Sequence, residues 1–253
     1  LRSGPKRAYA RYQAVRLREA ERALVARAVL TLAIQEGEAE TLRALAPGTR
    51  VATLPIGVDL ARFREPSPAR GPVVLLPGSF LWPPNVAGAE RFLDDGWPRV
   101  RARHPGARLR VAGKGPPPAL HAAVARAGGA GAGVELRADV PSMEAELAEA
   151  TVVVVPLWVG AGARVKIVEA MAARAPVVAT HLAAEGLDLE PELHYVAAET
   201  PEELGDGVAR LLDEPAERDR LAAVGHSLAE TRWSIEAVSR RQAALIAEAL
   251  GIG

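Results

Sequence analysis

From Pro72 onward, short runs of hydrophobic residues alternate with longer segments of mixed hydrophobic and polar character. The runs are continuous and rich in β-branched residues, which is typical of strands buried on both faces of a parallel sheet. Repeated alternation of such strands with helices predicts a doubly wound α/β domain with a ligand site at the carboxyl ends of its strands. We expect strands at 73–76, 108–112, 134–137, 152–156, 176–180 and 194–197.

The segments between these runs predict helices. The clearest start is at Thr200, where a capping side chain is followed by Pro201 at the first helical position and Glu203 at the third. Asn85 is expected to cap the helix that follows the first of these strands. The glycine-rich stretch 128–133 is interpreted as a flexible connector. Helices are expected at 85–103, 117–127, 142–150, 164–173 and 200–213, and two more at 216–230 and 234–250.

The residues before Pro72 follow a different pattern. They predict helices at 6–28 and 36–45, a strand at 51–54, and a linker at 64–72 that contains three prolines. The chain is therefore divided into three predicted parts, at 1–63, 64–230 and 231–253.

Composition narrows the classes of function. The net charge is zero, so bulk electrostatics do not indicate nucleic acid as a partner. The chain has no cysteine, which excludes disulfides, thiolate metal sites and cysteine nucleophiles. The longest hydrophobic run, at 151–159, is broken by Pro156 and is far shorter than the ~20 residues that span a bilayer. The first residues show no signal-peptide pattern, and we expect a cytoplasmic location.

The fourth of these strands is followed by a segment with candidate chemistry. Gly160 and Gly162 come directly before a predicted helix, where backbone N–H groups can approach an anion. Arg164 and Lys166 lie near the start of that helix, where the helix dipole disfavours cations by about 0.3–1 kcal/mol each unless an anion lies between them. This conflict indicates a phosphate site. The alternative is a solvated helix face on which Lys166 and Glu169 form an i,i+3 pair.

Four segments, in order, resemble the family 4 (group 1) retaining glycosyltransferases of the GT-B fold. One of them departs from the family pattern in having Ile56 where the family has asparagine. The four segments are 54–60 (LPIGVDL), 77–85 (PGSFLWPPN), 109–116 (LRVAGKGP) and 160–172 (GAGARVKIVEAMA), the last being followed by similar stretches at 176–180 and 184–186.

The resemblance implies a Rossmann-like donor domain at 64–230, a helical remnant of the acceptor domain at 1–63 and a terminal crossover helix at 231–253. It implies transfer of a sugar, with retention, from a nucleotide-diphosphate sugar to a glycan or lipid-linked acceptor, without a metal or other cofactor. Arg164 and Lys166 would hold the diphosphate and stabilise it as it leaves, and Glu169 would accept hydrogen bonds from the ribose. The resemblance also implies that the donor site is lined by Gly78, Gly113, Gly115, Gly160 and Gly162. Gly113 and Gly115 could alternatively form only a strand-to-helix turn.

The sequence departs from the family at two further places in the donor half. Ala161 stands where many members have a glutamate near the donor sugar, and the loop from Gly78 to Asn85 lacks the cations that many members place there. The acceptor-domain histidine of the family has no counterpart in the remnant. Of the five histidines, His181 ends a predicted strand and is the one that could line the cleft, while the others are expected to be surface or packing residues.

Other functions stay open at this point. The chain could be a binding module that holds a nucleotide without transfer, or a GT-B sugar-nucleotide epimerase, although the Arg-x-Lys-x-x-Glu helix start favours a transferase. A dehydrogenase is disfavoured because no Gly-x-Gly-x-x-Gly follows a strand. Apolar surface left by the missing acceptor domain is expected to be exposed or to pair with another chain. The segment near the amino terminus is basic and has two interpretations. It could form a solvated face or one covered by the missing domain, or it could contact the inner face of the membrane. Its cations are Arg2, Lys6, Arg7, Arg11, Arg16, Arg18, Arg22 and Arg27.

Overall fold

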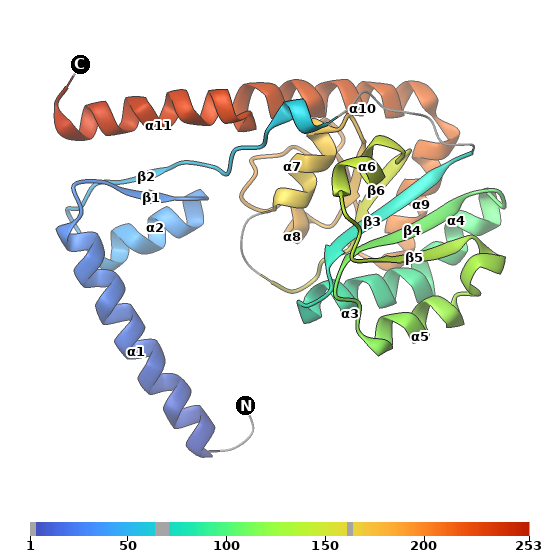
Figure 1. Ribbon diagram of the computed structural model, residues 1–253, viewed down its shortest axis with the longest axis horizontal. Helices are drawn as coiled ribbons and strands as arrows, with labels where there is room; N and C mark the ends of the chain where they lie inside the picture. Colours follow the sequence, from blue (N-terminus) through green and yellow to red (C-terminus); the bar gives the residue numbers. More distant parts are fainter. Residues whose placement is uncertain (1–3, 64–70, 161–163, 253) are drawn as a thin grey trace. The chain divides into compact units, whose positions relative to one another are not determined.

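The computed structural model describes residues 4–63, 71–160 and 164–252 (Figure 1). The chain separates into two compact units. The larger contains Val58–Ile235, and the smaller combines the residues up to Gly57 with those from Glu236 onward. Most of the predicted linker at 64–72 lies outside the described residues. The assignment of 1–63, 64–230 and 231–253 to parts of a glycosyltransferase stays a prediction.

The larger unit is built on one parallel sheet of six strands. Their order in space is β5-β4-β3-β6-β7-β8, so the strand order reverses between β3 and β6. This is the doubly wound arrangement that the alternating pattern predicted, and the predicted fold class is confirmed. The strands are β3 (Val73–Ser79), β4 (Arg108–Lys114), β5 (Val134–Ala138), β6 (Val152–Val155), β7 (Val177–Ala179) and β8 (Val196–Ala197).

Helices cover both faces of this sheet, which explains why its strands are continuously hydrophobic. Val74 and Leu76 pack into a cluster on one face, while Leu75 packs into a second cluster on the other. The first face is covered by α3 (Pro83–Arg91), α4 (Trp97–Arg103), α5 (Pro118–Arg126) and α9 (Pro201–Asp213). The second is covered by α6 (Met143–Ala148), α7 (Val165–Ala172), α8 (His181–Ala184) and a π-helical turn at Ala229–Trp233 that follows α10 (Pro215–Leu228). Short 3-10 turns lie at Leu60–Arg62 and Gly129–Ala132.

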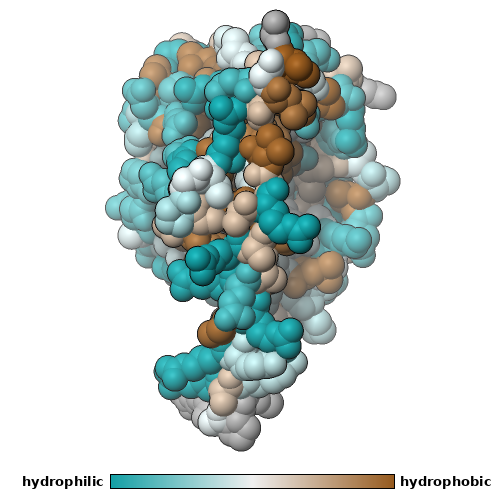
Figure 2. Space-filling model, turned by 90° about the vertical axis from the view of Figure 1, so that its left-hand side faces the viewer, coloured by the Kyte–Doolittle hydropathy of each residue, from teal (hydrophilic) through white to brown (hydrophobic). Residues whose placement is uncertain are grey.

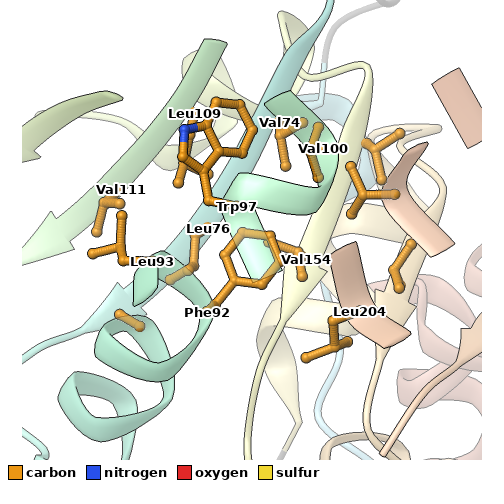
Figure 3. Close-up of a cluster of buried hydrophobic side chains, with 14 of the residues drawn as sticks. Val74, Leu76, Phe92, Leu93, Trp97, Val100, Leu109, Val111, Val154 and Leu204 are labelled. Atoms are coloured by element: carbon orange, nitrogen blue, oxygen red, sulfur yellow. The ribbon is translucent and has the colours of Figure 1, made fainter. Parts of the chain in front are cut away.

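The single helix predicted at 85–103 is in fact two helices joined by a π-helical turn at Phe92–Gly96. Residues five apart on an α-helix point about 140° away from each other. The wider π turn brings Phe92 and Trp97 toward the same side, and both are buried against the sheet (Figure 3). Burial of two large aromatic side chains in one cluster therefore decides the local geometry, which the helical pattern alone did not reveal.

The chain enters and leaves the larger unit at one place. Val58 N–H donates to the carbonyl of Trp233 at 2.7 Å, and Ile235 N–H donates to the carbonyl of Val58 at 3.0 Å. Trp233 is 3 % exposed and packs in the second cluster. Val58 of the Gly57-Val-Asp element is thus connected to the residues at the start of the last helix by backbone hydrogen bonds.

The smaller unit contains a two-stranded parallel sheet with a small core of five buried residues. Large hydrophobic side chains, among them Val29, Leu250 and Ile252, are exposed on this unit. In Figure 2, hydrophobic residues gather around the end of the last helix, above a more hydrophilic stretch. None of the described helices is long and apolar enough to cross a membrane. The elements are α1 (Gly4–Arg27), β1 (Thr31–Ala33), α2 (Glu36–Leu45), β2 (Val51–Thr53) and α11 (Ile235–Leu250).

Candidate functional site

The candidate site lies at the carboxyl ends of β3 and β6, where the strand order reverses. These strands are neighbours in the sheet, but the helices that follow them cover opposite faces: α3 follows β3 and α7 follows β6. The two connections diverge at this edge, which is where doubly wound proteins bind their ligands. The fold thus brings residues 78–85 to the same edge of the sheet as Gly160 and residues 164–169.

Glycines allow the strand ends to approach closely. Gly78 and Gly113 are register partners on β3 and β4. A Cβ atom at Gly113, which has φ +151°, would lie 1.7 Å from the Gly78 carbonyl oxygen. Both predicted glycines therefore shape the floor of the site through backbone contact.

Arg164 is a buried cation with incomplete hydrogen bonding. It immediately precedes α7 and is 7 % exposed, and its buried Nε atom has no hydrogen-bond partner among the described residues. Its nearest carboxylate contact among the described residues is a long one, 3.5 Å from Nη2 to Glu185, which is itself largely exposed. Desolvation lowers the pKa of the guanidinium, with Glu185 acting in the opposite direction. This arrangement contradicts the solvated-face alternative for Arg164 and leaves a buried donor for an anion.

Lys166 is the second residue of α7, two positions after Arg164. Its Nζ atom donates to Asn85 Oδ1 at 2.9 Å, and no carboxylate among the described residues lies within ion-pair distance of it. The i,i+3 pair with Glu169 that the sequence left open is thus not formed. Desolvation and, second, the charge of Arg164 lower the pKa of Lys166 to about 8.

Asn85 was expected to cap α3, and this prediction is wrong. Trp82 occupies the capping position, the two prolines that follow fill the first helical positions, and Asn85 comes third. Its side chain instead bridges the two connections of the site by binding Lys166 and the Ser79 carbonyl. The 81 residues between Asn85 and Lys166 explain why local sequence patterns could not reveal this contact.

Glu169 is partly buried at the second turn of α7, facing a second carboxylate. Desolvation raises its pKa, and the nearby charge of Glu144 on α6 raises it further. Glu144 itself forms an ion pair with Arg62. Within the described chain Glu169 makes no hydrogen bond through its side chain, so its oxygens are available to accept hydrogen bonds from a ligand.

The other predicted site residues have differing surroundings. Gly115 follows β4, and its N–H already donates to Asp139 Oδ1 at 2.9 Å, so that N–H is not available to a phosphate. Gly160 follows β6 with φ +135°, and a Cβ atom there would lie 2.2 Å from the Trp82 ring. Gly162 and Ala161 lie outside the described residues. His181 begins α8 rather than ending a strand, and its exposed ring pairs with Glu199.

The desolvated charge of Lys166, which is partly buried, gives a testable effect on stability. An unfolded lysine has a pKa near 10.4, so carrying the charge in the folded protein costs up to about 3 kcal/mol below pH 8. We expect Lys166→Met to increase the free energy of unfolding by about 1–3 kcal/mol at pH 7. The gain should fade as the pH rises from 8 to 10.4, because the folded lysine is then already neutral. Chemical denaturation at pH 7 and pH 10 measures this.

Exposed Lys114 provides the control for that measurement. Lys114→Met removes the same charge at a solvated position and should change the free energy of unfolding by less than about 0.5 kcal/mol. A gain at Lys166 that is equal at both pH values would contradict desolvation of the ammonium as its cause.

Comparison with known protein families agrees with this geometry. A family model described as "Glycosyl transferases group 1" matches residues 71–214, which is more than half of the chain. The chain belongs to this family. The match to the group 1 glycosyltransferases covers the sheet from β3 to β8 and therefore every residue of the candidate site. No curated protein matches the sequence closely enough to be called a relative.

Solved glycosyltransferases share the fold. Sucrose-phosphate synthase from Thermosynechococcus elongatus is 21% identical with a TM-score of 0.74, over 92% of this chain and 61% of that one. A glycosyltransferase from Rickettsia africae is 11% identical with a TM-score of 0.75, over 91% of this chain and 67% of the other. Alr3699/HepE from Anabaena, solved with UDP and glucose, is 18% identical with a TM-score of 0.72, over 91% and 67% of the two chains. This group 1 glycosyltransferase chain thus spans between 61% and 67% of their length.

The described residues contain no group of three or more His, Asp or Glu side chains that could hold a metal ion. The positive charge at the switch point comes instead from Arg164 and Lys166.

Proposed function

We propose that this chain binds the nucleotide diphosphate of a nucleotide-sugar donor, and that the protein to which it belongs transfers the sugar to an acceptor. Arg164 and Lys166 bind the diphosphate, and Glu169 binds the ribose hydroxyls. Transfer proceeds with retention to a glycan or a lipid-linked acceptor, as the resemblance of residues 160–172 to the retaining family implies. Membership of the group 1 family supports the reaction class, and Alr3699/HepE, which has this fold, was solved with UDP-glucose.

One observation carries the proposal. Two cations, Arg164 and Lys166, are desolvated at the amino end of α7, where the helix dipole repels them. Among the described residues neither has a carboxylate within 3.0 Å. Such an arrangement is unfavourable in the empty protein and becomes favourable when a dianionic group binds between them. A diphosphate supplies that charge, and its departure from the sugar is the step that two fixed cations accelerate.

The same two charges bear on cofactors. In phosphoryl and glycosyl chemistry a divalent cation or fixed protein cations can stabilise a leaving diphosphate. We propose that Arg164 and Lys166 take this role and that transfer requires no metal. Equal transfer rates with and without a chelator, and a product with the anomeric configuration of the donor, are the results expected. A chelator-sensitive rate would contradict the first, and an inverted product the second.

Calorimetric titration of the chain with UDP, GDP and ADP tests binding and identifies the base. We expect micromolar affinity for one of the three. Glu169→Ala should weaken binding of that nucleotide about ten- to hundredfold, because a hydrogen bond to a charged group contributes about 1.5–3 kcal/mol. The loss should be much smaller for the 2′,3′-dideoxy form of the same nucleotide, which lacks the hydroxyls that Glu169 is proposed to bind.

Equal losses for the ribose and dideoxy forms would place Glu169 away from the ribose. Arg126→Ala, which removes an exposed cation at the carboxyl end of α5, is the charge control and should leave both affinities unchanged.

A second assay distinguishes a transferase from an isolated binding module and from an epimerase. Only a transferase releases nucleoside diphosphate from the sugar nucleotide in proportion to the acceptor that is added. A binding module or an epimerase would show no such dependence on the acceptor.

A further inference from the structure

Asn85 is the residue through which the β3 connection reaches the α7 cations. Its side chain is 9 % exposed and uses both ends of the amide. The Nδ2 group donates to the Ser79 carbonyl at 2.8 Å, and Oδ1 accepts from Lys166 Nζ at 2.9 Å. One end of the amide is thus attached to the backbone that leaves β3, and the other to a cation that follows β6.

The chemistry of the two partners fixes the orientation of this amide. A backbone carbonyl such as that of Ser79 can only accept a hydrogen bond, and the lysine ammonium can only donate. The reversed amide would place two donors together at Lys166 and two acceptors together at Ser79. The oxygen of Asn85 must therefore face Lys166, and this acceptor is presented in a single direction.

The packing of α3 holds Asn85 in place. Gly88 lies one turn after Asn85, on the same side of α3. A Cβ atom at Gly88 would lie 1.9 Å from the carbonyl oxygen of Pro156, so the helix backbone rests directly on the end of β6. This close approach directs the first turn of α3 toward α7, which begins nine residues later in the chain than Pro156.

The neutrality of Asn85 matters as much as its position. A carboxylate at this place would also bind Lys166, but it would cancel the charge that a diphosphate needs. An amide oxygen orients the ammonium by one hydrogen bond, leaves its charge intact and leaves two of its three N–H groups for a ligand. The charged neighbours of Lys166 are Arg164 and Glu169, both on or directly before its own helix.

We infer that Asn85 is a positioning residue, which aims the Lys166 ammonium at the diphosphate across the switch point without neutralising it. The inference rests on the proposed function. The connection after β3 contains no cation of its own. In this inference it contributes to diphosphate binding by orienting Lys166 of α7. Asn85 itself does not touch the reacting atoms.

A double-mutant cycle tests this in the full 253-residue chain. Calorimetric affinities for UDP, GDP and ADP are measured for the wild type, Asn85→Ala, Lys166→Met and the variant that carries both changes. We expect Asn85→Ala to weaken the preferred nucleotide about five- to tenfold in the wild type and less than twofold in the Lys166→Met background. Thr200→Ala, which removes a comparable side-chain-to-backbone hydrogen bond at the start of α9, should leave the affinity unchanged.

Asn85→Asp adds a readout that a purely structural role would not alter. The carboxylate should keep Lys166 protonated to higher pH while cancelling its charge. We expect weaker binding than in the wild type at pH 7 together with a smaller further loss between pH 7 and pH 9, where the wild-type lysine loses its proton. A protein that is merely loosened by the substitution would keep the wild-type pH dependence.

The outcomes separate the two proposals. Equal losses from Asn85→Ala in both backgrounds would overturn the positioning role while leaving the donor site intact. A wild type that binds none of the three nucleotides would overturn the proposed function and this inference with it. Both proposals are supported if Asn85→Ala weakens nucleotide binding only when Lys166 is present and Asn85→Asp alters the pH dependence of binding.

Discussion

Replacing Arg164 by alanine is expected to weaken binding of the nucleoside diphosphate by about 30-fold, which corresponds to about 2 kcal/mol. Arg164 is 7 % exposed, and its Nε atom has no hydrogen-bond partner in the part of the chain that the structure describes. A diphosphate that accepts hydrogen bonds from this group would satisfy a buried donor and pair a desolvated charge. Because the same charge is weakly compensated in the empty protein, the substitution should not lower the stability of the apo chain.

Titration calorimetry and thermal unfolding of the same samples measure the two effects. Arg164→Lys keeps the charge without the planar fork and should bind with intermediate affinity. Arg126→Ala removes an equal charge at an exposed ion pair with Asp94 and should bind like the wild type. If Arg164→Ala bound the nucleotide as tightly as the wild type, the diphosphate would have to lie elsewhere.

Replacing Gly113 by alanine is expected to destabilise the larger unit by about 3–5 kcal/mol. The added Cβ atom would lie 1.7 Å from the Gly78 carbonyl oxygen, which is backbone and cannot rotate away. The φ of +151° adds strain that a residue with a side chain cannot relieve. The strands β3 and β4 would have to separate at their carboxyl ends, so nucleotide binding should fall together with stability.

Thermal unfolding should show a melting temperature lower by roughly 10 °C, since 1 kcal/mol corresponds to about 2–4 °C for a unit of this size. Gly106→Ala is the matched control, because a Cβ atom at Gly106 meets nothing within 4 Å and its φ is not in the left-handed region. That variant should melt within about 2 °C of the wild type. A Gly113→Ala protein that melted equally close to the wild type would show that the strand ends tolerate separation.

The elements of the larger unit followed from the sequence because burial on both faces leaves a strong local pattern. The continuous hydrophobic runs marked all six strands, with boundaries within three residues of those observed. The pattern joined α3 and α4 into one helix at 85–103, where the π turn buries Phe92 and Trp97 together, and it did not predict the short helix α8 (His181–Ala184). Hydrophobic spacing indicates which face is buried, but it does not show that a turn has widened to bury two aromatic rings.

The candidate site was partly determined by the sequence as well. The residue types and spacing of Gly160, Arg164, Lys166 and Glu169 at a strand-to-helix turn were sufficient to indicate an anion site, because cations at a helix start are unfavourable without one. Arg164 is buried, with an Nε atom that none of the described residues binds, and Glu169 lies near Glu144 of another helix. Both features depend on elements that pack together only in the folded chain.

Asn85 shows where the limit lies. From the sequence it was a helix cap, an interpretation that uses only the residues next to it. Its actual partners are the backbone of β3 and a lysine 81 residues away, brought together because β3 and β6 are neighbours in the sheet. The sequence by itself determined the strands and the order of chemically important residues along the chain, and it indicated the proposed anion site, since these depend on local periodicity and residue type. Only the tertiary structure decided which side chains meet across the switch point, because that depends on strand order, which no local pattern encodes.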